Sequence, residues 1–227
     1  MTYRLVEVQK SVLSKNAGLA RDLRQRFAES GTFVLNLLSS PGAGKTTLLE
    51  ETLRRLASTH RAAALVGDQA TDNDSLRLAR AKVAVRQITT GAECRLDALM
   101  VGKALDGWAL ADYDLLCIEN VGNLICPAEY DLGEDLRVTL MSVTEGEDKP
   151  LKYPLAFNTA QTIIITKIDL SSATGFDRAA ARANIERVHP GVQVIELSAR
   201  SGQGLNEWLE LVEQRVQAKR VAAPASV

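Results

Sequence analysis

Seven short β-rich runs alternate with segments of helical periodicity between residues 32 and 219. Several of these runs are apolar on both faces, as expected for parallel strands that helices cover on each side. The alternation predicts a three-layer, doubly wound α/β fold with a mostly parallel sheet of about seven strands. The expected strands are residues 32–39, 62–67, 83–89, 114–120, 136–143, 162–167 and 192–198. Ligands of such sheets bind outside the carboxyl ends of the strands, so we expect the functional residues in the loops that follow them.

Helices are expected between these strands and at both ends of the chain. The N-terminal segment carries apolar residues at helical spacing, and Gly31 follows as a stop signal. We expect three parts: a helical segment over 1–31 packed on the main domain, the main domain over 32–219, and a flexible tail over 220–227. The expected helices follow Lys45, Asp74 and Cys94 and cover 178–188 and 205–219; the apolar N-terminal residues are Leu13, Ala17, Ala20, Leu23 and Phe27.

Composition excludes several classes of protein. Lys plus Arg total 27 and Asp plus Glu total 28, so no charge excess favours nucleic acid or an anionic membrane as a partner. No apolar run of membrane-spanning length and no apolar signal region is present, which predicts a cytoplasmic protein. Three widely spaced cysteines predict no disulfide framework.

The segment "SSPGAGKTT" joins the first expected strand to an amphipathic helix. Glycines at 42 and 44 let backbone N–H groups point at phosphate oxygens, and the helix N-terminus favours negative charge. Lys45 is expected to reach the β- and γ-phosphates, and the Thr46 hydroxyl to bind Mg²⁺. Ser39 replaces the usual first glycine of this pattern, where the chain only has to begin a turn. The predicted phosphate-binding residues are Gly42, Ala43, Gly44, Lys45, Thr46 and Thr47.

Two further strand ends carry carboxylates suited to Mg²⁺. Glu119 ends the run "DLLCIEN", and Gly122, three residues on, is placed to meet the γ-phosphate through its N–H. Asp68 begins the acidic stretch "DQATDND", in which Asp68, Asp72 and Asp74 are candidates for a Mg²⁺ ligand or a water-positioning group; Asp74 is alternatively the cap of the helix that begins at Ser75. We assign Lys45, Asp68, Glu119 and Gly122 to catalysis.

The segment "IIITKIDL" favours guanine over adenine. Asp169 is placed to accept from guanine N1–H and N2–H, which adenine lacks, while the Lys167 stem lies along the base. The segment "LSARSG" follows the last strand, where a backbone N–H would contact guanine O6. It contributes Ser198, Ala199 and Arg200.

The cysteines fall into two groups. Cys117 lies within an apolar strand and is expected in the core. Cys94 and Cys126 follow strands and are expected near the γ-phosphate, with Cys94 at a helix start beside Arg95, where a lowered thiol pKa favours metal binding. Two cysteines make only half of a tetrahedral site, so a buried structural role is the alternative.

The chain resembles the HypB family, GTPases of the SIMIBI group of P-loop proteins that assist nickel insertion into [NiFe]-hydrogenase. The resemblance rests on "NLLSSPGAGKTTLL", "GDQATDNDSLR", "IENVGNLICPAEYDLGED" and "SVTEGEDKPLKYP" and extends over nearly the whole chain. It implies a slow GTPase that converts GTP to GDP and phosphate with Mg²⁺. It also implies a homodimer in the GTP state and a HypA-like maturation partner.

The resemblance assigns roles to individual residues. Asp68 and Glu119 look like Mg²⁺-site carboxylates, and Lys149 looks like a lysine that reaches the partner's nucleotide. Cys94 and Cys126 match the family's metal-binding cysteines, which are suited to Ni²⁺ or Zn²⁺. Arg95 stands where the family has a histidine, and a guanidinium cannot bind a metal. Two other functions therefore stay open: a GTPase switch that recruits a maturation partner without binding metal, and a P-loop kinase acting on a small acceptor.

Overall fold

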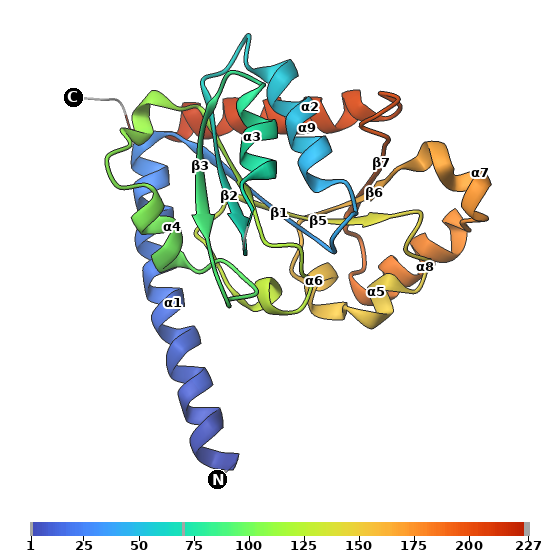
Figure 1. Cartoon of the computed structure of the whole chain (residues 1–227), viewed down its shortest axis with the longest axis horizontal. Helices are drawn as coiled ribbons and strands as arrows, with labels where there is room; N and C mark the ends of the chain where they lie inside the picture. The colour runs from blue at the N-terminus through green and yellow to red at the C-terminus, as the bar shows by residue number, and fades with distance from the viewer. Residues whose placement is uncertain (1, 70, 225–227) are drawn as a thin grey trace.

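A single seven-stranded parallel sheet organises the chain (Figure 1). The computed structural model describes residues 2–69 and 71–224. The strand order is β3-β2-β4-β1-β5-β6-β7, which confirms the predicted doubly wound fold. The strands are β1 (Phe33–Ser39), β2 (Ala62–Asp68), β3 (Ala84–Thr89), β4 (Leu115–Glu119), β5 (Leu136–Ser142), β6 (Thr162–Thr166) and β7 (Gln193–Glu196). Each lies within a predicted run or extends one residue beyond it.

Most predicted helices form close to their expected positions. The α-helices are α1 (Thr2–Ser30), α2 (Lys45–Leu56), α3 (Asn73–Ala79), α4 (Ala98–Ala104), α5 (Lys149–Lys152), α6 (Pro154–Asn158), α7 (Ser171–Thr174), α8 (Arg178–Val188) and α9 (Leu205–Ala222). Three 3-10 turns are η1 (Leu110–Asp112), η2 (Cys126–Glu129) and η3 (Ile168–Leu170). Helix α9 reaches three residues into the segment predicted as a tail, whose residues 225–227 lie outside the described part of the chain.

The helix expected directly after Cys94 starts later than predicted. Asp97 is its N-cap, and its carboxylate accepts a hydrogen bond of 2.8 Å from the Met100 N–H. That bond satisfies a donor that the first helical turn leaves free, so the helix begins at Ala98. Cys94 therefore lies in the preceding loop, and its predicted place at a helix N-terminus is wrong.

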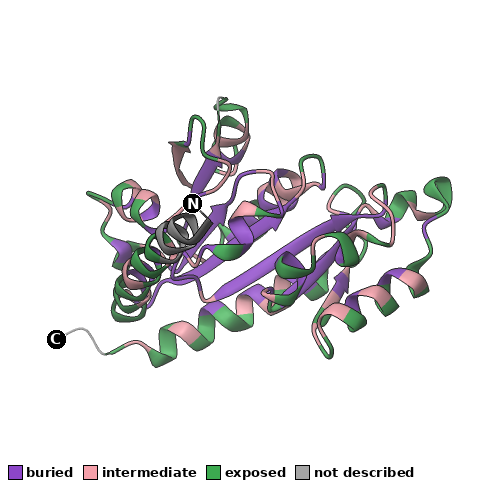
Figure 2. Cartoon of the chain, turned by 90° about the horizontal axis from the view of Figure 1, so that it is seen from below, coloured by how far each residue is buried: buried purple, intermediate pink, exposed green. Residues whose placement is uncertain are grey.

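Side-chain alternation along β1 builds a core on each face of the sheet. Leu35 and Leu37 pack with α2 and α9 on one face, and Val34 packs with α1 and α4 on the other. Leu38 joins a third cluster with α6 and α8. Figure 2 shows the central strands as buried along most of their length, with exposed residues on the outer sides of the helices. Burial on both faces explains why the strands carry near-continuous apolar runs.

Helix α1 packs against α4 through its C-terminal half. Ala20, Leu23 and Phe27 are buried as predicted, whereas Ala17 is exposed. The loop after β4 approaches the helix so closely that a Cβ on Gly133, at φ +80°, would lie 2.8 Å from the Ala20 carbonyl oxygen. This contact ties the N-terminal helix to a loop that leads from the candidate site. Among the described residues, no helix has the length and apolar character needed to cross a membrane.

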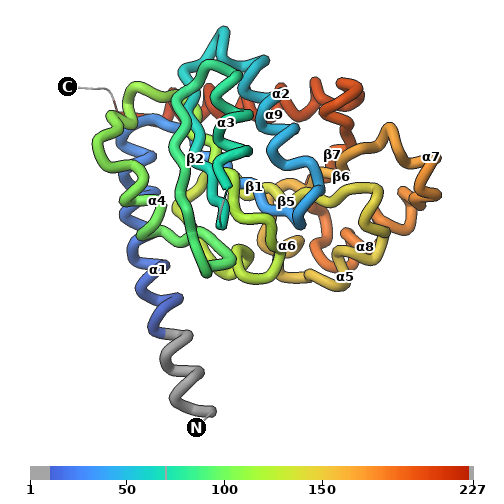
Figure 3. Tube along the Cα trace, in the orientation of Figure 1, coloured from blue at the N-terminus to red at the C-terminus, as the bar shows by residue number. Residues whose placement is uncertain are grey.

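The central position of β1 places its following loop between the ends of β4, β5 and β6. β1 pairs with β4 on one side and β5 on the other, and the Thr166 hydroxyl at the end of β6 donates to the Ala43 carbonyl at 2.6 Å. In the chain trace, β1 runs into α2 at the middle of the molecule (Figure 3). Residues from separate parts of the sequence therefore meet around one loop.

Candidate functional site

The loop between β1 and α2 has the backbone of a phosphate-binding loop. Gly42 (φ +77°) and Gly44 (φ +96°) take left-handed conformations that side chains disfavour, and Gly44 caps α2. The loop lines a cavity of about 580 Å³ together with residues from the ends of β2 and β4. Of the predicted site residues, this cavity brings together Gly42, Gly44, Lys45, Thr46, Thr47, Asp68, Gly122 and Lys167.

Glu119 lies buried directly behind the phosphate-binding loop. Its Oε1 accepts a hydrogen bond of 2.6 Å from the Thr46 hydroxyl and lies 3.2 Å from the Lys45 ammonium. Burial raises the pKa of Glu119, an effect opposed by the positive charge of Lys45 and the hydrogen bond from Thr46. The strand ends thus hold a hydroxyl, an ammonium and a carboxylate in contact.

These oxygen donors fit Mg²⁺. The Oε2 atom of Glu119 is buried and has no hydrogen-bond partner among the described residues. A buried carboxylate oxygen is costly to leave unpaired, and a hard cation would satisfy it. Thr46 and Asp68 line the same cavity and carry further oxygen atoms of the kind that Mg²⁺ prefers.

Asp68 ends β2 at the edge of the phosphate cavity. The Thr71 hydroxyl donates to its Oδ2 at 2.9 Å, and the Thr90 N–H donates to its carbonyl at 2.9 Å. Asp74, the candidate helix cap, lies inside the first turn of α3 rather than at its cap, and it also lines the cavity. The acidic stretch therefore contributes two carboxylates to the phosphate region.

Gly122 brings the loop after β4 against the phosphate-binding loop. A Cβ at this position would lie 3.3 Å from Cγ of Pro41, closer than side chains usually approach. The glycine therefore allows a close approach that places the 121–122 backbone in the cavity lining.

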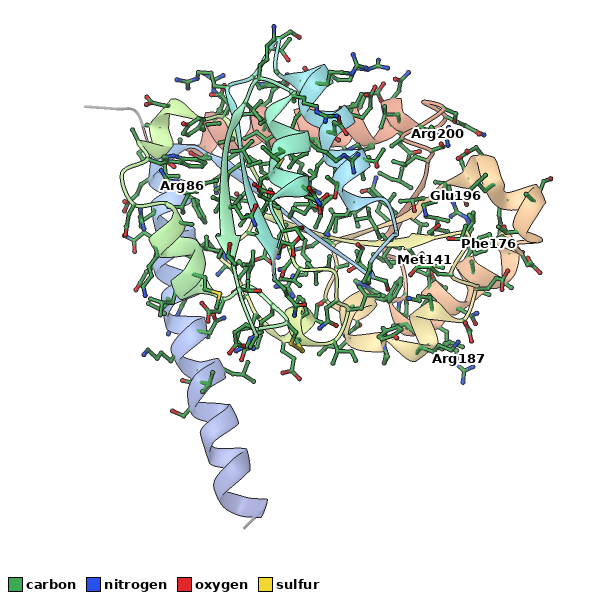
Figure 4. The ribbon with its side chains drawn as sticks, in the orientation of Figure 1. Arg86, Met141, Phe176, Arg187, Glu196 and Arg200 are labelled. Atoms are coloured by element: carbon green, nitrogen blue, oxygen red, sulfur yellow. A yellow bond between two sulfur atoms is a disulfide. The ribbon has the colours of Figure 1, made fainter. Side chains whose placement is uncertain are left out.

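A second cavity of about 290 Å³ adjoins the first and contains the predicted guanine residues. Asp169, Ser198, Ala199 and Arg200 line it, and Thr47 and Lys167 line both cavities. The Lys167 ammonium donates to the Gly42 carbonyl at 2.6 Å, so its stem crosses from β6 to the phosphate-binding loop. Figure 4 shows Arg200 in the segment between β7 and α9.

The segment 198–200 differs in one detail from the sequence interpretation. The Ser198 N–H already donates to the Gln203 carbonyl at 2.8 Å. A donor to a guanine oxygen would therefore come from the backbone of Ala199 or Arg200. Ser198 instead holds the loop closed, because its side-chain oxygen accepts from the Ser201 N–H at 3.2 Å.

Lys149 lies outside both cavities of its own chain. Its ammonium is 2.8 Å from the Glu145 carboxylate and 5.0 Å from the centre of the Tyr153 ring. The structure therefore does not bring Lys149 to the nucleotide site within one chain.

Cys94 and Cys126 are joined by a disulfide, drawn as a yellow bond in Figure 4. The expectation of no disulfide is therefore wrong. The loops after β3 and β4 reach the same edge of the sheet, and they place the two Cα atoms 6.2 Å apart, within disulfide range. Cys117 is fully buried in β4, as predicted. Within the described residues, no group of three or more His, Cys, Asp or Glu side chains is arranged to hold a metal ion.

The Arg95 side chain is held by two neighbouring residues, Tyr130 and Glu93. Its guanidinium lies 4.0 Å above the Tyr130 ring centre and pairs with the Glu93 carboxylate at 2.6 Å. Stacking and ion pairing together hold the cation in place. Arg95 thus places a fixed positive charge at the position where the resembling family has a histidine.

Arg77 is a cavity residue that the sequence interpretation missed. It lies on α3 and lines the phosphate cavity, and its Nη2 donates to the Thr47 hydroxyl at 3.1 Å. The available signal was an arginine one helical turn after Asp74, in the helix that follows the acidic stretch. Periodicity gave no way to place that helix beside α2.

Comparison with known proteins agrees with this geometry. The CobW/HypB/UreG nucleotide-binding domain family matches residues 33–196. A hydrogenase maturation factor HypB from Azotobacter chroococcum mcd 1 is 48% identical over 93% of this chain and 70% of its own length. The chain belongs to the HypB family.

Solved HypB structures share the same architecture. HypB from Archaeoglobus fulgidus superposes with a TM-score of 0.84 at 38% identity, covering 89% of this chain and 99% of that one. HypB from Helicobacter pylori in complex with nickel gives a TM-score of 0.84 at 34% identity, covering 94% and 99%. The HypB relationship confirms the P-loop fold of the SIMIBI type and a nucleotide-binding family.

Proposed function

We propose that the chain is a Mg²⁺-dependent GTPase that assists nickel insertion into [NiFe]-hydrogenase. The observation that carries the proposal is the joining of a phosphate cavity to a second cavity containing Asp169. Its curated HypB relatives are named hydrogenase maturation factors, and the H. pylori relative was solved with nickel. Together these support a GTP-driven step in metal delivery.

In the proposed reaction, water attacks the γ-phosphorus and the bond to the β,γ-bridging oxygen breaks, giving GDP and phosphate. Lys45 and the loop N–H groups bind the phosphates and offset their charge. Thr46, Asp68 and Glu119 would hold Mg²⁺, which when bound stabilises charge on the phosphate oxygens. The backbone N–H of Gly122 would meet the γ-phosphate and sense its loss.

Nucleotide titrations test this function directly. We expect GDP and a GTP analogue to bind in preference to ADP and an ATP analogue, and GTP to yield free phosphate slowly with Mg²⁺. Adenine preference would refute the guanine assignment. A phosphorylated small acceptor in place of free phosphate would indicate a kinase.

The GTP-bound form is proposed to dimerise across the nucleotide face. Lys149 lies outside its own cavities and is held by Glu145, which suits a role toward a partner's nucleotide. Light scattering should show a dimer with a GTP analogue and a monomer with GDP. Lys149→Ala should weaken the dimer, while Lys152→Ala, an exposed lysine on the same helix, should not.

Nickel is proposed to bind between two chains through reduced Cys94 and Cys126. One chain supplies two thiolates, and a dimer supplies four, suited to a planar Ni²⁺ or a tetrahedral Zn²⁺ site. A HypA-like maturation protein is the proposed partner in delivery.

A second candidate is a GTPase switch that recruits this partner without binding metal. The Cys94–Cys126 disulfide and the charge of Arg95 favour it, since a disulfide offers no thiolate and the guanidinium is not a ligand. Thiolate-dependent metal absorption in the reduced protein separates the two candidates.

A further inference from the structure

Arg77 links the helix after the acidic stretch to the phosphate-binding helix. Helices α3 and α2 lie side by side (Figure 3). The Arg77 Nη2 donates to the Thr47 hydroxyl at 3.1 Å and to the Glu50 carboxylate at 2.8 Å. Its Nη1 lies 4.0 Å from the Asp74 carboxylate. One guanidinium thus contacts the first turn of α2 and two acidic side chains.

Thr47 marks the part of the site that Arg77 reaches. Thr47 lines both the phosphate cavity and the second cavity, which contains Asp169 and is called the base cavity below, so Thr47 lies at their junction. A nucleotide that spans the two cavities has its first phosphates at this junction. The Arg77 side chain is 36% exposed and also lines the phosphate cavity, so the guanidinium is accessible to a ligand there.

The cationic side chains that line the phosphate cavity differ in how firmly they are paired, and this comparison favours Arg77 as a further phosphate contact. Among the described residues, the cations that line this cavity are Lys45, Arg77 and Lys167. Lys45 is paired with buried Glu119, and Lys167 donates to a backbone carbonyl. Arg77 is paired with Glu50, whose carboxylate is 30% exposed. A phosphate oxygen can replace a partly exposed carboxylate as the partner of a guanidinium, because both accept its planar fork of donors.

We propose that Arg77 binds the phosphate chain of the nucleotide beside Thr47, exchanging its contact with Glu50 for phosphate oxygens. This inference rests on the proposed nucleotide-binding function and adds a binding residue to the same site. Because α3 follows the Asp68 segment, the contact also couples that segment to a bound nucleotide. Arg77 reads phosphates that GDP and GTP share, so it contributes to binding of both.

The competing explanation is that Arg77 only pins α3 to α2. The two explanations give opposite results for Glu50→Gln. If Arg77 binds phosphate, neutralising Glu50 releases the guanidinium and tightens nucleotide binding. If Arg77 is only a pin, the same change weakens the pin and gives no gain in affinity.

The experiment measures dissociation constants of GDP, ADP and a GTP analogue by calorimetry, with Mg²⁺, for the full chain and its variants. For Arg77→Ala we expect about tenfold to hundredfold weaker binding of GDP and the GTP analogue alike, the usual effect of losing a charge-assisted hydrogen bond. Arg77→Lys should lose less. Arg80→Ala, an exposed arginine at the end of the same helix, is the matched control and should bind like the parent.

Glu50→Gln should bind both nucleotides more tightly, and adding Arg77→Ala should abolish that gain. Thermal melting of each variant without nucleotide separates loss of folding from loss of binding. The proposal is overturned by parent-like affinity in Arg77→Ala, by a loss confined to the GTP analogue, or by no gain in Glu50→Gln. A parent that prefers ADP contradicts the proposed GTPase function instead, and the Arg77 comparison then holds with ADP.

Discussion

Asp169→Asn tests whether the Asp169 carboxylate recognises the guanine base in the base cavity. In the proposed complex, the Asp169 carboxylate accepts from N1–H and N2–H of the base, and each hydrogen bond to a charged group contributes about 1.5–3 kcal/mol. The asparagine carbonyl can still accept from N1–H, but its NH2 group faces the N2–H donors, so one of the two bonds is lost; this removes about 1.5–3 kcal/mol and predicts roughly 10- to 10²-fold weaker GDP binding. Asp169 is exposed at the edge of the cavity, so we expect the fold to be stable to the change.

The same substitution should create a new preference. An asparagine amide can donate to the 2-carbonyl of xanthine, so xanthosine diphosphate should bind Asp169→Asn better than the parent. The assay is fluorescence titration with GDP, xanthosine diphosphate and ADP. Asp106→Asn, an exposed aspartate outside both cavities, is the control. Unchanged GDP affinity in Asp169→Asn, or no gain for the xanthine nucleotide, would refute the reasoning.

Three other predictions concern catalysis and stability. Glu119→Gln should make nucleotide binding about 10- to 100-fold less responsive to Mg²⁺, because a carboxylate at the metal is lost; an unchanged Mg²⁺ titration contradicts the assignment. Reducing the Cys94–Cys126 disulfide, with 32 residues of sequence separation, should lower the free energy of unfolding by about 3–4 kcal/mol in urea, and Cys94→Ala should be insensitive to reductant. Burial raises the pKa of Asp131, but the hydrogen bonds from Arg24 and from the Gly133 N–H, together with the positive charge of Arg24, outweigh burial and lower the pKa overall. The Arg24–Asp131 pair therefore stabilises the fold above the ordinary aspartate range and less as pH falls through the lowered pKa; Arg24→Gln should lose up to about 1 kcal/mol at pH 7 and nothing in strong acid.

The fold was predictable because its signals are local. Strands β1 and β5 are buried along their whole length and are mainly apolar, and the phosphate-binding glycines stand between a strand and a helix. The carboxylate of Glu119 could be placed because a strand end in a parallel sheet fixes which edge it reaches.

The missed features depend on contacts between distant segments. The position of Arg77 follows from the packing of α3 on α2, which no single-segment pattern contains. The disulfide follows from two loops meeting at one sheet edge. The start of α4 was misplaced because Asp97 competes successfully with earlier residues as the cap, through a hydrogen bond that spacing alone did not identify.

Metal binding under two nucleotide states tests the central claim most directly. The reduced full chain is titrated with Ni²⁺ in the presence of GDP or a GTP analogue, while thiolate-to-metal absorption and particle mass are followed. The account predicts nucleotide-dependent absorption, one nickel per two chains in the GTP-analogue dimer, and loss of the absorption in Cys94→Ala. Identical binding in both nucleotide states, or binding that survives Cys94→Ala, would contradict it.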